Sequence, residues 1–106
     1  MLRTYNRILD IIQKRVFAGT WVMPNPCECI LYLIQELGEL SDAHMRCTVE
    51  HVRRRDREEA SPMEEVGDVL LMTLLYIHSS GLDVEEVVDE LCRKLVDVHN
   101  VKLDDK

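Results

Sequence analysis

Two pairs of acidic residues share one spacing, and both lie in segments with helical patterns. Glu36 and Glu39 are three residues apart, and so are Glu65 and Asp68. Residues three apart on an α-helix point from one face with their Cβ atoms about 5–6 Å apart, so each pair presents two carboxylates together. If the two pairs face each other, four carboxylates meet, and a cation relieves their repulsion. Oxygen ligands in that number favour Mg²⁺, or Mn²⁺, over zinc.

The position of these acids in their segments supports the metal hypothesis. Glu36 and Glu39 border an apolar stripe, and Glu65 and Asp68 come just before a long apolar run. No lysine or arginine lies one helical turn from any of the four, so a salt bridge within the helix cannot neutralise them. The alternative is four solvated helix residues, because glutamate is common on helices and favours their first turns. A di-iron carboxylate site is disfavoured, because the chain has no Glu-x-x-His.

The composition predicts one small, acidic, globular domain. The length of 106 residues predicts a single domain over residues 1–106. Apolar residues make up 46% and charged residues 31%, which is ordinary for a soluble globular protein. The net charge of −7 disfavours nucleic acid as a partner, because neutralising phosphates needs a basic surface. The arginine-rich run at residues 53–57 is predicted to be a solvated helix end or loop.

The sequence predicts a cytoplasmic protein with no membrane partner. The N-terminal stretch mixes charged with apolar residues and predicts no signal peptide. The longest apolar run, Val69–Ile77, is too short to cross a bilayer. The four cysteines do not form paired Cys-x-x-Cys knuckles, so we expect free thiols in a reducing compartment. They are Cys27, Cys29, Cys47 and Cys92.

Three helix starts share one capping pattern. Asn25, Ser61 and Asp83 each precede a glutamate by three residues, and a proline directly follows the first two. This is the capping box, with proline where its missing N–H needs no partner. Gly19 and Gly81 mark helix ends. No segment predicts a strand, so the predicted fold is all-α and resembles a four-helix bundle. The predicted helices cover residues 4–18, residue 26 to the arginine run before residue 61, residues 62–79 and residues 83–100.

The apolar stripes of these helices predict an oligomer. The Val69–Ile77 segment is apolar around nearly its whole circumference, and such a helix needs cover on all sides. Three partner helices can scarcely supply that cover, which predicts helices packing across the interface of a homodimer or homotetramer. A regulatory interaction partner would also use this surface, but self-association explains it more simply. The short turn at residues 80–82 predicts that the last two helices are antiparallel neighbours. The stripes expected to face inward are Tyr5, Ile8, Ile12 and Val16; Ile30, Leu33, Leu37, Leu40 and His44; and Val87, Leu91, Leu95 and Val98.

The acidic segments resemble a known family. Residues 36–43 read ELGELSDA and residues 64–70 read EEVGDVL. Together they are similar to the MazG-type nucleotide pyrophosphohydrolases of the all-α NTP pyrophosphatase superfamily, and the resemblance covers roughly residues 25–100. It implies an enzyme that cleaves a (d)NTP between the α and β phosphates to a monophosphate and pyrophosphate, in housekeeping removal of noncanonical or excess nucleotides. It also implies the catalytic residues and Mg²⁺ ligands, which are Glu36, Glu39, Glu65 and Asp68.

The resemblance suggests two substrate contacts and shows two departures, one of which is Cys92, where the family often has an asparagine two residues before its basic residue. Lys94 is at the family's basic position and would neutralise phosphate charge; the alternative is a solvated helix lysine. Trp21, in the connector at residues 19–25, would either stack on the base or plug the end of the bundle. Gln35 stands where the family has glutamate, and an amide cannot serve as a general base. A catalytically weak or inactive helical oligomer that binds metal, nucleotide or another protein is therefore the alternative function.

Overall fold

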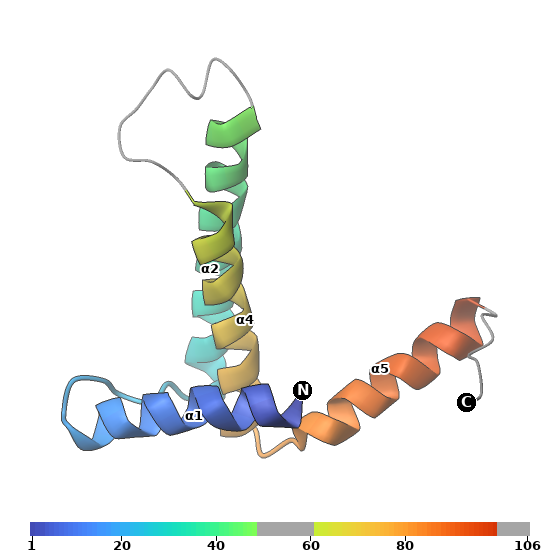
Figure 1. Cartoon of the computed structure of the whole chain (residues 1–106), viewed down its shortest axis with the longest axis horizontal. Helices are drawn as coiled ribbons and strands as arrows, with labels where there is room; N and C mark the ends of the chain where they lie inside the picture. The colour runs from blue at the N-terminus through green and yellow to red at the C-terminus, as the bar shows by residue number, and fades with distance from the viewer. Residues whose placement is uncertain (49–60, 100–106) are drawn as a thin grey trace.

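The chain folds into helices whose ends lie close to the predicted ones. The computed structural model describes residues 1–48 and 61–99, and no strand occurs in these ranges (Figure 1), which confirms the all-α class. No helix in these ranges combines the length and the apolar character that a bilayer span requires. The arginine run at residues 53–57 lies outside the described residues. The helices are α1 (Leu2–Phe17), α2 (Pro26–Thr48), α4 (Pro62–Ser79) and α5 (Val84–His99).

The predicted caps form hydrogen bonds at three helix starts. Asn25 Oδ1 accepts from the Glu28 N–H at 2.8 Å, and Glu28 Oε1 accepts from the Asn25 N–H at 3.0 Å. Ser61 Oγ accepts from the Glu64 N–H at 3.3 Å. Asp83 Oδ1 accepts from the N–H groups of the second and third residues after it, at 2.8 and 3.2 Å. These bonds satisfy backbone donors that the first helical turn leaves open, and they confirm where α2, α4 and α5 begin.

Two glycines redirect the chain after α1 and α4. Gly19 has φ of 80° and Gly81 has φ of 75°, in the left-handed region where a side chain is strained. Gly19 leads from α1 into the connector, and Gly81 leads from α4 toward α5. Both glycines lie where the sequence predicted helix ends.

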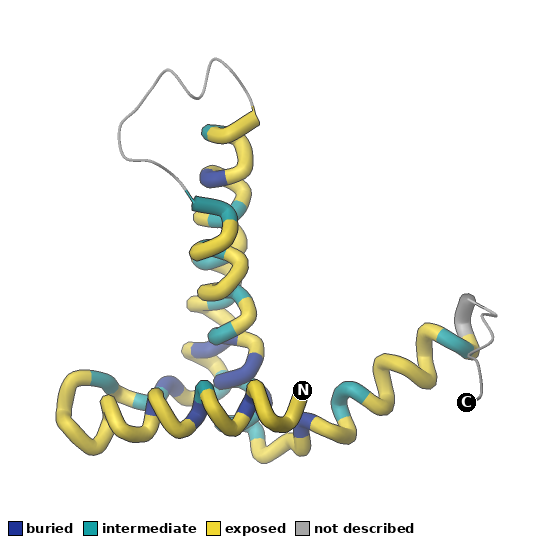
Figure 2. Tube along the Cα trace, in the orientation of Figure 1, coloured by how far each residue is buried: buried dark blue, intermediate teal, exposed yellow. Residues whose placement is uncertain are grey.

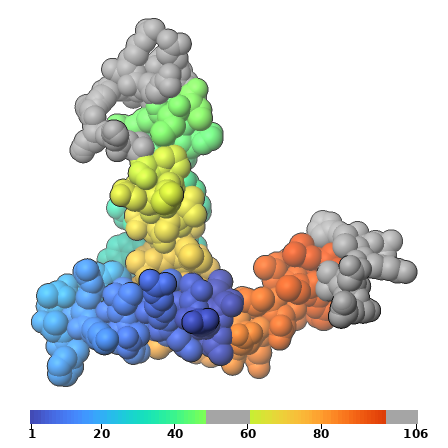
Figure 3. Space-filling model, viewed as in Figure 1, coloured from blue at the N-terminus to red at the C-terminus, as the bar shows by residue number. Residues whose placement is uncertain are grey.

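An antiparallel hairpin of α2 and α4 dominates the contacts between helices, and α1 crosses its lower end (Figure 1). Helix α5 contacts α1 and α4 but not α2, and it leads away from the hairpin (Figures 1 and 3). Val84, in the first turn, is the one buried residue among the described side chains of α5. The predicted antiparallel packing of the last two helices is therefore wrong, because the turn at Gly81 sends α5 outward after this single anchor.

The hydrophobic core lies where α1 crosses the hairpin (Figure 2). The predicted stripe on α1 is correct for Tyr5, Ile8 and Ile12, but Leu9 is buried in place of Val16. The apolar run of α4 supplies Leu74 and Leu75, which together with Cys29 of α2 are the most deeply buried residues, and α1 covers one side of this run. The buried core residues are Tyr5, Leu9, Ile12, Cys29, Met72, Leu74, Leu75, Ile77 and Val84.

The side of α2 that packs on α4 agrees with the prediction at Leu33 and Leu40 but is rotated from it at the other predicted positions. Ile30, Leu37 and His44, which were predicted to face inward, are exposed. Apolar residues occupy more than one side of this helix, so periodicity alone does not reveal which side packs. The less exposed residues recur at spacings of four and three, which follows one helix face. They are Cys29, Leu33, Glu36, Leu40 and Ala43.

Several other apolar side chains are exposed in the single chain. Leu91 and Leu95 of α5 are 52% and 47% exposed, although the sequence predicted that they face inward. Val66, near the start of α4, is 52% exposed. The side chain of Val98 lies outside the described residues. These surfaces are uncovered because α5 leads away from the hairpin and α1 reaches only its lower end.

Candidate metal centre

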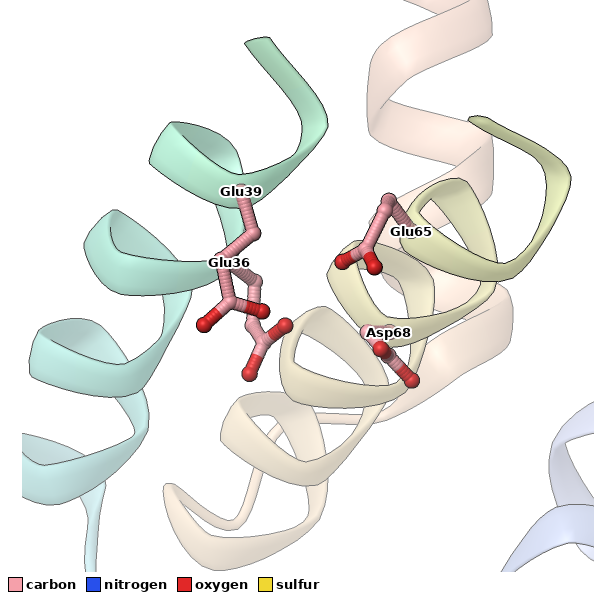
Figure 4. Close-up of side chains that lie close together, drawn as sticks. All are labelled: Glu36, Glu39, Glu65 and Asp68. Carbon is pink, nitrogen blue, oxygen red and sulfur yellow. The ribbon is translucent and has the colours of Figure 1, made fainter. Parts of the chain in front are cut away.

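The four acidic residues singled out from the sequence meet between α2 and α4 (Figure 4). Each offers one carboxylate oxygen, and these oxygens all lie within 4.8 Å of one another. Glu36 and Glu39 come from α2, and Glu65 and Asp68 come from α4. Each pair keeps to one helix face because its members are three residues apart, and the antiparallel hairpin brings the two faces together.

The cluster has an inner pair and an outer pair. Glu36 and Glu65 are half-buried, whereas Glu39 and Asp68 are exposed. The sequence placed Glu36 at the edge of an apolar stripe, but the structure places it within the face of α2 that packs on α4. An inner carboxylate loses hydration on folding and needs a partner to replace it.

Two inner oxygens lack such a partner. Glu36 Oε1 and Glu65 Oε1 are buried and have no hydrogen-bond partner among the described residues. The pKa of Glu36 is raised to about 7. Burial is the largest cause, followed by Glu39, whose charge repels the ionised form and which can hydrogen-bond only to a protonated Glu36 carboxyl, and then by the charges of Asp68 and Glu65. Burial is also the first cause of the raised pKa of Glu65, followed by the charges of Glu39 and Asp68. The cluster therefore concentrates negative charge where water only partly screens it.

This donor set fits a hard divalent cation. Carboxylate oxygens converging from two rigid helices are ligands that Mg²⁺ and Mn²⁺ accept. A doubly charged ion among them would give the two orphaned oxygens a partner. It would also offset the repulsion that raises the pKa of Glu36 and Glu65. No salt bridge links any of the four carboxylates to a basic residue in the described part of the chain.

A cavity of about 470 Å³ opens beside the cluster. Glu36 belongs both to the cluster and to the lining of the cavity, so the cavity borders the cluster. The connector between α1 and α2 forms one wall, and residues of α2 and α4 form the rest. The lining residues are Gly19, Thr20, Trp21, Val22, Pro24, Tyr32, Glu36 and Met72.

The structure brings one of the two predicted substrate contacts to this site. Trp21 lines the cavity and also packs against the core, so its position suits both the base-stacking and the plug interpretations. Lys94 is exposed on α5, which makes no contact with α2. Within one chain, Lys94 is therefore not part of the site.

Sequence reasoning missed the residues of the cavity wall other than Trp21 and Glu36, among them two on helices, and one hydrogen bond at the cluster. Tyr32 lies four residues before Glu36, and Met72 lies four residues after Asp68. This one-turn spacing from a cluster acid is the signal that would have found both. Gln35 Nε2 donates to Glu39 Oε2 at 3.5 Å. The amide that departs from the family pattern thus contacts an outer carboxylate.

Comparison with known proteins assigns the family. The model of the MazG nucleotide pyrophosphohydrolase domain matches residues 25–102, which include α2, α4, α5 and the whole acidic cluster. The chain belongs to this family. No curated protein and no solved structure matches it.

Proposed function

We propose that this protein hydrolyses nucleoside triphosphates between the α and β phosphates and releases a nucleoside monophosphate and pyrophosphate. The observation that carries the proposal is the convergence of four carboxylate oxygens within 4.8 Å in a member of the MazG family. By the same resemblance, its cellular role is housekeeping removal of noncanonical or excess ribo- or deoxyribonucleotides. The proposal treats residues 1–106 as one domain that acts in the cytoplasm.

Mg²⁺ is the proposed cofactor, with Mn²⁺ as a substitute, and Glu36, Glu39, Glu65 and Asp68 would hold it. When bound, the ion would neutralise phosphate oxygens and supply the Lewis acidity that favours attack of water on phosphorus. The packing of α2 on α4 fixes the inner pair, Glu36 and Glu65, before substrate arrives. The outer pair, Glu39 and Asp68, is exposed, so a triphosphate would reach the cluster from their side.

The cavity is the proposed place for the nucleoside. Glu36 and Trp21 both line it. A triphosphate at the carboxylates would direct its sugar and base into this space. Trp21 is already packed on the core and loses little side-chain freedom when a base stacks on it.

A second copy of the chain is proposed to complete the assembly as a homodimer or homotetramer. Leu91 and Leu95 form an exposed apolar stripe on α5, and helix geometry places Lys94 beside it. If this stripe packs on another copy, Lys94 is carried to that copy and can neutralise phosphate charge there. In the single chain, Lys94 is a solvated helix lysine, so its proposed role depends on this association.

Pyrophosphate release tests the activity. Purified full-length protein is incubated with a panel of NTPs and dNTPs plus Mg²⁺, and we expect release from at least one of them. Glu39→Gln removes one charge from the cluster and is expected to lower kcat at least about 100-fold, the scale of losing one preorganised electrostatic group. Asp42→Asn is the matched control, because Asp42 is exposed on the same helix and pairs with Arg46 at 2.9 Å outside the cluster. We expect it to retain activity within about twofold.

One observation favours the alternative of a weak or inactive metal- or nucleotide-binding oligomer. Gln35 occupies the position of a family glutamate and donates its amide to Glu39, so no carboxylate is present there to accept a proton from water. Absence of pyrophosphate release with every nucleotide, in protein that binds Mg²⁺, would support this alternative and contradict the enzymatic proposal.

A further inference from the structure

Tyr32 is a large aromatic side chain on the cavity wall with no role in the proposal above. It is 46% exposed, and it is not among the residues that pack against the core. Trp21, on the same cavity, is half-buried against that core. The cavity therefore has one anchored aromatic residue and one whose ring is half open to solvent. A ligand that covers the Tyr32 ring would remove apolar surface from water.

Helix register places Tyr32 on a defined side of the acidic cluster. It lies one turn before Glu36 on α2, and Met72 lies one turn after Asp68 on α4. Because α2 and α4 run in opposite directions, one turn before Glu36 on α2 and one turn after Asp68 on α4 lead toward the same end of the hairpin. Tyr32 and Met72 therefore lie on the same side of the cluster, toward α1 and the connector, and both line the cavity.

The lining of this cavity combines two kinds of chemistry. It includes Glu36, which belongs to a cluster that suits a divalent ion and hence a polyphosphate. It also includes the aromatic residues Tyr32 and Trp21 and the apolar residues Val22 and Met72. The volume of about 470 Å³ falls within the range of about 300–1,000 Å³ found for small-molecule sites. A ligand with an anionic end and a planar aromatic end matches both.

We propose that Tyr32 is a specificity-determining residue: together with Trp21 it holds the aromatic base while the phosphates lie at the acidic cluster. It thereby selects nucleoside polyphosphates over polyphosphates that lack a base. The inference rests on the proposed function, because it assigns the phosphates to the same carboxylates. Beyond that function, it assigns to Tyr32 the binding of the base.

Binding to the cavity can be measured without catalysis. Trp21 is the only tryptophan in the chain, so its fluorescence reports on the cavity wall. The full chain is titrated in Mg²⁺ with α,β-methylene ATP and, separately, with inorganic tripolyphosphate. We expect a saturable change with the nucleotide analogue and none with tripolyphosphate. Tyr32→Ala is expected to raise the Kd for the analogue about tenfold, within the range measured for base–aromatic stacking. Tyr32→Phe keeps the ring and is expected to stay within about twofold.

Ile34→Ala is the comparator, because Ile34 is exposed on the same helix and does not line the cavity. The size of every variant is measured by light scattering after gel filtration. Unchanged binding in Tyr32→Ala would overturn the inference. Equal weakening in Ile34→Ala would overturn it too, since the loss would then come from the surface of α2 and not from the cavity.

Kinetics separate a failure of this inference from a failure of the proposed function. If the protein releases pyrophosphate, Tyr32→Ala should raise KM for a nucleotide and leave kcat nearly unchanged. Release with an unchanged KM would overturn the role of Tyr32 and leave the activity standing. No release from any nucleotide, with Tyr32-dependent binding of the analogue, would overturn the activity and leave the binding role standing.

Discussion

The two inner carboxylates of the cluster, Glu36 and Glu65, are the ones whose ionised forms are disfavoured by burial. Glu36 Oε1 and Glu65 Oε1 are buried without a hydrogen-bond partner among the described residues, and burial is the first cause that raises both pKa values. Acids with this arrangement take up a proton or a cation, because an unpaired charge is unfavourable there. The same property that suits the site to a metal ion therefore lowers the stability of the ion-free protein.

The ion-free protein is expected to lose stability as the pH rises from about 4.5 to about 7. The pKa of Glu36 is raised from 4.5 to about 7 in the folded chain, so the folded state binds more protons than the unfolded state within this window. The contribution of Glu36 to the free energy of unfolding is complete below pH 4.5 and is lost as the pH rises through about 7. The loss is at most about 3 kcal/mol, because one pKa unit corresponds to about 1.4 kcal/mol and solvent screens part of it.

Urea unfolding in EDTA between about pH 5 and about pH 8 measures this slope. Glu36→Gln should make this slope smaller, with the raised pKa of Glu65 accounting for what remains, and Asp42→Asn serves as the control outside the cluster. Saturating Mg²⁺ should restore stability at the higher pH, because the ion replaces the proton. A slope that Glu36→Gln does not alter would contradict the assignment of the raised pKa to this residue.

Local signals in the sequence define the helices that carry the site. The capping residues Asn25, Ser61 and Asp83 form the hydrogen bonds that their spacing predicts, and Gly19 and Gly81 end their helices in the left-handed conformation. These features depend on neighbours within a few residues, so the sequence is sufficient to predict them. The packing side of α2 is different, because it depends on contact with α4 and was predicted incorrectly at Ile30 and Leu37.

The capping box of α2 should contribute measurably to stability. Asn25→Ala removes the side-chain acceptor for the Glu28 N–H and is expected to lower the free energy of unfolding by about 1 kcal/mol. Asn6→Ala is the matched control, since Asn6 is exposed within α1 and the same substitution there slightly favours helix. Urea unfolding at one fixed protein concentration measures both variants. Equal changes at the two sites would show that the cap does not stabilise α2.

The whole molecule is more open than one chain of this size usually is. Its Cα radius of gyration is 17.3 Å, whereas a compact domain of this length has about 13 Å. Two features contribute to this openness: α5 leads away from the hairpin, and the hairpin extends beyond α1 (Figures 1 and 3). An amphipathic helix with one exposed apolar stripe buries that stripe against another element, and the described part of the chain offers none.

Disrupting the α5 stripe tests the proposed self-association. The double substitution Leu91→Glu and Leu95→Glu places two charges on the exposed stripe, and we expect the protein to become monomeric, as measured by analytical ultracentrifugation. Phe17→Glu is the control, because Phe17 is 94% exposed at the end of α1 and away from α5. A protein that stays associated after the double substitution, or is monomeric before it, would contradict self-association through α5.

The sequence by itself determined the helical class, the start of each internal helix and the pairing of acids on two helix faces. These features depend on the spacing of residues along one helix, and this spacing can be counted directly in the sequence. Only the tertiary structure decided that Glu36 is an inner ligand candidate, that Tyr32 and Met72 share a cavity with Trp21, and that Lys94 is remote from the cluster in the single chain. These relations depend on how α1 and α5 leave the hairpin. They follow from one turn at each glycine and from packing between residues far apart in sequence, which no local pattern encodes.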